Sequence, residues 1–201
     1  MPKLAPLVAL TLTATFTMTF AAGPRFCPVL MEEERLERAD RRIDVEVAEA
    51  TLVAYKRILD MTKQLRESDA IDELTYLEAK YDFDAAVIAV ERAKVKLGRQ
   101  DALLTVYGET CGEGIAREEA ARAEQAYRKA NCDQQDLLMR QENINVTYQI
   151  ALLDSVRELH GTVATDTDLI LAELAVQQEE LRRADAERRT RDCRENLPKR
   201  P

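Results

Sequence analysis

The chain contains no proline between Pro28 and Pro198, and this stretch is rich in alanine, leucine, glutamate, arginine and glutamine. Proline inside a helix removes a hydrogen bond and costs about 3 kcal/mol, so its absence permits helix over most of the chain. Every glycine except Gly98 falls where the apolar periodicity breaks. The sequence therefore predicts an all-α protein of a few very long helices separated by well-marked turns.

The composition favours amphipathic helices over a thick globular core. Charged residues make up 33% of the chain and aromatic residues 5%, with no tryptophan. Such a chain can bury narrow apolar stripes between helices. The formal net charge of -8 argues against a nucleic-acid partner, because phosphate binding needs a basic surface.

The first residues have the pattern of a secretory signal peptide, which we expect to span residues 1–21. Lys3 precedes an apolar, threonine-dotted run from Leu4 to Phe20, and small residues follow. Cleavage after Ala21 is the prediction. An uncleaved membrane anchor is the alternative, because the run is barely long enough to span a bilayer. The expected location is the periplasm or the outer membrane.

The next segment, residues 22–114, predicts a first helical hairpin. Its apolar residues recur at spacings of three and four, as in the seam of a coiled coil. The predicted seam of its first helix consists of Leu36, Ile43, Val47, Ala50, Ala54, Ile58, Met61 and Leu65. A turn with the helix N-cap candidates Ser68, Asp69 and Asp72 follows. The predicted seam of the second helix consists of Leu74, Leu77, Tyr81, Ala85, Ile88 and Val95, before a loop over 108–114.

Residues 115–201 predict a second hairpin with a basic C-terminal tail. Helices are expected from about Ile115 to Leu159 and from Leu169 to about Asp192. A shift of 94 residues, which brings Leu59 onto Leu153, superimposes the two hairpins. The further matches are Leu65 with Leu159, Ala70 with Ala164, Asp72 with Asp166 and Leu77 with Leu171. We interpret the chain as two copies of one hairpin that together form an elongated four-helix unit.

The four cysteines provide an independent test of the two turns. The midpoint of Cys27 and Cys111 is position 69, and that of Cys132 and Cys193 is 162.5, so each lies inside a predicted turn. Residues equidistant from a hairpin turn lie side by side, as a disulfide requires. We therefore predict disulfides Cys27–Cys111 and Cys132–Cys193 in an oxidising compartment. Four unpaired cysteines with accidental symmetry are the alternative.

No catalytic or metal-binding constellation is visible in the sequence. His160 is the only histidine and lies at a turn, so histidine-based triads and multi-histidine zinc sites are excluded. The cysteines lack a C-x-x-C spacing, and no glycine-rich phosphate loop occurs. The sequence predicts a protein that is not an enzyme and binds no cofactor or metal.

The two turns are the candidate functional positions. They combine apolar residues with glycine and aspartate at the ends of long hairpins, where a partner helix could dock. The alternative is that the apolar residues close each hairpin locally, as a hydrophobic staple does. The candidate docking residues are Leu65, Ala70, Ile71, Asp72, Leu159, Gly161, Val163 and Ala164.

The segment from Glu67 to Asp82 resembles the periplasmic helix-turn-helix of the outer-membrane efflux protein (TolC-like) family. There a turn of the form G-L-V-x-x-x-D leads into an A-x-A-x-Y-D helix, and Ala79 and Tyr81-Asp82 match the latter part. The second hairpin supplies Gly161, Val163 and Ala164, then Asp168-Leu169. The family's membrane strands have no counterpart in this sequence.

This resemblance implies a component or accessory of an efflux or secretion assembly. It also implies self-association, with three copies supplying six hairpins of a helical tube, and helical envelope transport proteins as partners. A periplasmic adaptor (membrane-fusion) protein is the runner-up. Leu65, Ala70 and Ile71 fit its R-x-x-x-L-x-x-x-G-A-I-S tip, while Met61, Asp69 and Asp72 do not. A free helical scaffold or chaperone of the envelope, which binds clients in a groove, is a further alternative.

Overall fold

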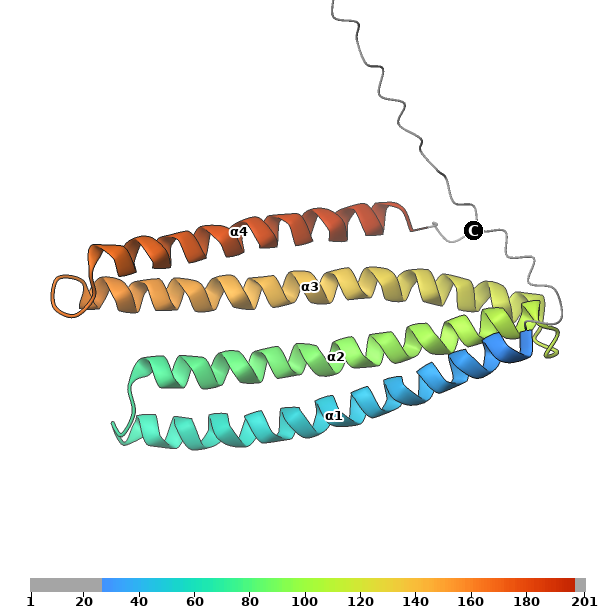
Figure 1. Cartoon of the computed structure of the whole chain (residues 1–201), viewed down its shortest axis with the longest axis horizontal. Helices are drawn as coiled ribbons and strands as arrows, with labels where there is room; N and C mark the ends of the chain where they lie inside the picture. The colour runs from blue at the N-terminus through green and yellow to red at the C-terminus, as the bar shows by residue number, and fades with distance from the viewer. Residues whose placement is uncertain (1–26, 198–201) are drawn as a thin grey trace, which may run out of the picture.

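The computed structural model describes residues 27–197, which form four helices joined by short turns (Figure 1). These are α1 (Cys27–Glu67), α2 (Glu73–Thr110), α3 (Arg117–Leu159) and α4 (Asp166–Glu195). The prediction of an all-α protein is confirmed for this part of the chain. The expected signal peptide and the end of the basic tail lie outside the described residues.

The four helices form a single layer in chain order. Helix α1 packs on α2, α2 on α3 and α3 on α4, and no other pair of these helices is in contact (Figure 1). As residue numbers rise along α1 they fall along α2 at the contacts Arg38–Asp101 and Arg66–Glu73, so the two helices run in opposite directions. The layer leaves α1 and α4 as its two edges, each with one neighbour.

The densest packing lies along α2, which is covered on both sides. Its buried residues are mostly small, and alanine lets two neighbouring helices approach closely while costing little side-chain entropy. They are Ala79, Ala86, Ile88, Val90, Ala93, Gln100, Ala102 and Gly108. The inner helix α2 therefore supplies much of the narrow core that a chain with few aromatic residues can build.

The seam predicted for the first helix is wrong, because all eight of its residues are exposed. A different set of positions, spaced alternately by four and three, is partly or fully buried beside α2. These positions are Cys27, Met31, Glu34, Arg38, Arg41, Val45, Ala48, Leu52, Tyr55, Leu59 and Thr62. Helix α1 thus carries two heptad stripes, and the more polar one faces its neighbour.

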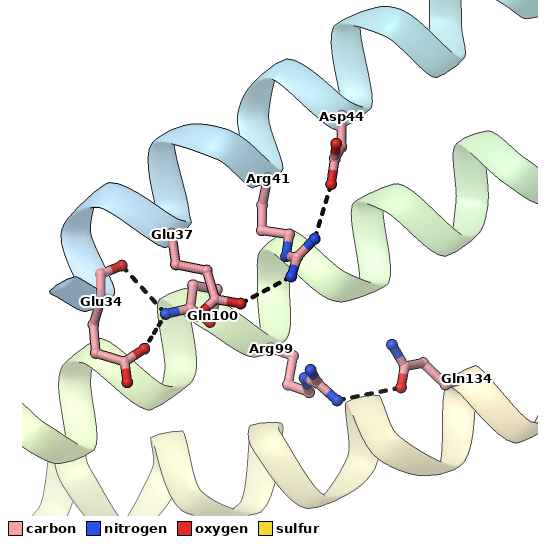
Figure 2. Close-up of polar contacts among 7 residues, drawn as sticks. All are labelled: Glu34, Glu37, Arg41, Asp44, Arg99, Gln100 and Gln134. Atoms are coloured by element: carbon pink, nitrogen blue, oxygen red, sulfur yellow. Dashed lines mark hydrogen bonds and ion pairs between the residues drawn. The ribbon is translucent and has the colours of Figure 1, made fainter.

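Polar partners on α2 explain this choice of face. The Gln100 side chain donates to both the backbone oxygen and the carboxylate of Glu34 (Figure 2). One turn further on, the Arg38 guanidinium pairs with Asp101. Since Glu34 and Arg38 are bonded to partners across the interface, their polar groups can lie in the seam without being left unpaired. Their α2 partners cannot be inferred from α1 alone.

The disulfides form as the cysteine spacing predicts. Cys27 is bonded to Cys111 and Cys132 to Cys193, each with its Cα atoms 5.5 Å apart. The first bond ties the start of α1 to the residue after α2, at the end of the layer opposite the α1–α2 turn (Figure 1). The second ties the last turns of α4 to α3, so both edge helices are covalently held to their neighbours.

Candidate functional site: the two hairpin tips

The α1–α2 and α3–α4 turns lie at the same end of the layer (Figure 1). The first turn comprises residues 68–72 and the second residues 160–165. Each turn is short because a residue in the left-handed conformation follows one helix and a capping residue soon begins the next. We call these two turns, with the helix ends that flank them, the tips.

The first tip is built by a helix stop and a helix start in direct succession. The amide of Ala70 donates to the Leu65 carbonyl at 2.9 Å and that of Asp69 to the Arg66 carbonyl at 3.0 Å, which is a Schellman motif. Asp69 occupies the left-handed position with φ 54°, where glycine is usual. Asp72 then caps α2, because its side chain accepts from the Thr75 amide at 2.8 Å.

The second tip has a glycine in the left-handed position and a different set of turn hydrogen bonds. Gly161 has φ 83°, and the amides of Val163 and Ala164 both donate to the Leu159 carbonyl at 3.0 Å. Thr165 caps α4 in a reciprocal capping box with Asp168. The carboxylate that caps α4 is therefore not Asp166, the residue that aligns with Asp72.

The structure brings the predicted apolar residues to the surface of the tips. Val163 is 78% exposed, and Leu65, Ala70 and Leu159 are exposed as well, while Ile71 and Ala164 are half-buried. The carboxylate of Asp72 is engaged as a helix cap, so its role at the tip is local. Apolar side chains in a turn of this kind are available for contact with a partner.

Side-chain contacts brace each tip from the side. Arg66 pairs with Glu73 at 2.6 Å and lies over the ring of Tyr76, 4.3 Å from its centroid. In the second tip the ring of His160 lies 2.8 Å from the Asp166 carboxylate. His160 is exposed. These contacts hold the turns in shape and leave the apolar residues uncovered.

Two features of the surface were missed by the sequence reasoning. One is a groove between α2 and α3, lined by Leu77, Tyr81, Ile144, Tyr148 and Ala151. The other is the outward face of each edge helix, which carries apolar residues that no described helix covers. The second heptad stripe of α1 was the signal for the latter, but it was assigned to the inner seam.

The described residues give little support for other kinds of site. Within residues 27–197, histidine, cysteine, aspartate and glutamate side chains nowhere gather in a group that could hold a metal ion. None of the four helices is sufficiently long and apolar to cross a membrane. The shifted pKa values belong to capping, paired or partly buried groups spread along the layer.

Comparison with known proteins adds no functional assignment. No family model, no curated protein and no solved structure matches this chain. The resemblance to the TolC-like family therefore stays a prediction. The candidate contact surfaces are the tips and the outward faces of α1 and α4.

Proposed function

We propose that this protein is a non-enzymatic coiled-coil component or accessory of an efflux or secretion assembly in the cell envelope, and that its tips dock a helical partner. The observation that carries the proposal is the placement of two apolar tips at one end of a stiff layer. Exposed apolar side chains at such a place favour a protein contact, since they gain free energy when a partner removes them from water.

The coiled-coil character of the two pairs is supported by the spacing of their least exposed residues. On α1 these recur alternately every four and three residues from Cys27 to Thr62. On α4 the same alternation runs from Leu169 to Cys193. Such a repeat keeps one stripe against a neighbouring helix over a long distance. The helices then act as rigid spacers between the tips and the opposite end of the layer, where Cys27 is bonded to Cys111.

Export is supported by the two disulfides. Disulfides persist in oxidising compartments such as the periplasm and are rare in the cytosol. Both disulfides are formed, and the described residues contain no free cysteine. A periplasmic or outer-membrane location therefore agrees with the covalent structure.

A free helical scaffold is the second candidate, and the groove between α2 and α3 favours it. The groove is mostly apolar and partly open to solvent, and the stacked rings of Tyr81 and Tyr148 are part of its lining. A client segment would bind there instead of at the tips. An adaptor-like role shares the tip contact and differs only in which envelope protein is bound.

Site-directed crosslinking distinguishes these functions in whole cells. Photoreactive maleimides would be attached at Ala70→Cys and Val163→Cys, one at each tip, with Gln125→Cys on the shaft of α3 as the matched exposed control. The native cysteines are bonded, so the added thiol is the one in this chain that reacts. Capture of one defined helical transport protein from both tips, and not from position 125, is the expected result. The same scattered clients from all three positions would contradict tip docking and favour the scaffold.

A further inference from the structure

The outward face of α1 is built like an interface, although no described helix covers it. Residues about half a turn away from the α2-facing seam form a second apolar stripe along most of the helix. Inner helices such as α2 and α3 need two such stripes because they have two neighbours. The exposed stripe consists of Leu36, Ile43, Val47, Ala50, Ala54, Ile58, Met61 and Leu65.

The internal repeat shows what kind of neighbour this stripe fits. A shift of 94 residues brings Ile43 of α1 onto Leu137 of α3. Ile43 is 58% exposed, whereas Leu137 is 4% exposed, and α3 differs from α1 in having helices on both sides. The same shift brings Leu77 of α2 onto Leu171 of α4, which is 57% exposed. The α2–α3 contact is thus a template for a contact between an α4 and an α1.

The template predicts which residues would meet. At the α2–α3 contact, Leu77, Lys80 and Tyr81 lie opposite Ile144, Thr147 and Tyr148. The corresponding residues on the free edges are Leu171, Leu174 and Ala175 of α4 and Ala50, Val53 and Ala54 of α1. All six are apolar, and the stacked tyrosine pair is replaced by two alanines. Small residues allow the two helices to approach more closely than α2 and α3 do.

Charge decides between the pairings that two copies could make. The heptad positions on either side of the α1 stripe carry acidic residues. Glu32, Asp44, Glu46, Asp60 and Glu67 are all exposed there. Two α1 helices packed on each other would bring these carboxylates together, which is unfavourable. The outward face of α4 carries the exposed arginines Arg182, Arg188, Arg189 and Arg191 together with the acidic residues Asp185, Asp192 and Glu195, so it lacks the excess of negative charge that flanks the α1 stripe.

One of these acidic residues, Asp185, lies among the arginines. Asp185 is the repeat equivalent of Glu91, which pairs with Arg140 across the α2–α3 contact. Asp185 is instead held by Arg188 and Arg189 of its own helix. Its charge is thereby balanced within α4, so Asp185 adds little repulsion toward the acidic residues beside the α1 stripe.

We propose that the outward face of α4 in one copy binds the outward face of α1 in a second copy. The interface is heterologous, so each bound pair still has one free α1 edge and one free α4 edge. Such a contact adds further copies until the assembly closes on itself, or extends without closing. The lateral contact is independent of the tip contact proposed above, because it uses the sides of the edge helices.

Thiol crosslinking tests the pairing directly. Ala54→Cys and Ala175→Cys replace the equivalents of Tyr148 and Tyr81, and within one copy they are separated by three interhelical spacings, about 25–30 Å in total. A short bis-maleimide should produce covalent dimers from an equal mixture of the two single variants. It should produce no covalent dimers from either variant by itself. Dimers of Ala54→Cys alone would show α1 packed on α1, and the absence of any link in the mixture would also overturn the proposal.

Light scattering tests whether the contact holds copies together in solution. The wild-type chain should have a mass above the 22.8 kDa of one copy. Leu171→Glu with Leu174→Glu should weaken association by about a hundredfold or more, because two leucines lose their burial. Val53→Glu, on the opposite edge, should do the same, with helix content by circular dichroism unchanged in each case.

The matched control is Val163→Glu, which puts the same charge on a tip. It should leave the mass unchanged while abolishing crosslinking to a tip partner. A monomeric wild-type chain at the highest concentration reached would overturn the lateral contact. So would a Val163→Glu variant that dissociates as fully as the edge variants, since association would then run through the tips.

Discussion

The ring of Tyr81 on α2 stacks on that of Tyr148 on α3, with centroids 4.6 Å apart and planes 28° from parallel. The Tyr81 hydroxyl also donates to the Asn145 side chain at 3.0 Å. The α1–α2 pair contacts the α3–α4 pair only between α2 and α3. The two tyrosines are therefore part of the one junction between these halves of the described layer. The junction is held by a few aromatic and polar side chains and the small residues between them.

Truncation at this junction should loosen the two halves from each other. We expect Tyr81→Ala to lower the free energy of unfolding by about 2 kcal/mol, through lost burial and lost stacking. Tyr81→Phe should cost about 1 kcal/mol or less, because the stack remains and Gln141 still donates to Asn145. Urea unfolding followed by circular dichroism measures both. Equal losses in the two variants would mean that the hydroxyl, and not the ring, holds the junction.

Each disulfide should contribute strongly to stability, because it closes a long loop. The bonded cysteines are separated by 84 and 61 residues, and the chain-entropy estimate for such loops is about 4 kcal/mol each. Replacing either pair by serine should lower Tm by about 10 °C. Scanning calorimetry of the two double variants checks this. Melting temperatures within error of the wild type would contradict the chain-entropy contribution of the two bonds.

The two left-handed turn residues should respond in opposite directions to substitution. Asp69 holds φ 54° at a cost that glycine avoids, so Asp69→Gly should stabilise the protein by about 0.5–1 kcal/mol. Gly161 holds φ 83°, so Gly161→Ala should destabilise it by about 1–2 kcal/mol. Thermal melts of the two variants provide the measurement. A stabilising Gly161→Ala would show that the second tip does not keep this conformation.

Acid should weaken both helix starts at the tips. Hydrogen bonds with Thr75 lower the pKa of Asp72, and those with Thr165 lower the pKa of Asp168. A lowered pKa in the folded state means that the stabilisation is complete above the ordinary value of about 4 and is lost as the pH falls through the folded value. The Tm advantage of the wild type over a variant with Asp72→Asn and Asp168→Asn should therefore shrink below about pH 4. An advantage that is unchanged down to about pH 2 would exclude these two carboxylates as the source.

Local signals in the sequence were sufficient for the helices and the disulfides. The proline-free stretch, the capping residues Asp72 and Thr165, and the glycines near the turns act within a few residues of where they stand. The symmetric cysteine spacing then gave the correct pairing, because two helices joined by a short turn have only one side-by-side arrangement. The tip residues could also be located from the sequence, although their partner could not.

The tertiary structure alone decided which face of α1 is inside. Both stripes of that helix have heptad spacing, and the exposed one, with Ile43 and Val47, is the more apolar. The chain buries the stripe with Glu34 and Arg38 because Gln100 and Asp101 on α2 bond these groups, and such partners lie more than 60 residues away. Periodicity determines that a helix has a face to bury. Only the complementary surface of its neighbour determines which face that is, and whether another remains free for a second molecule.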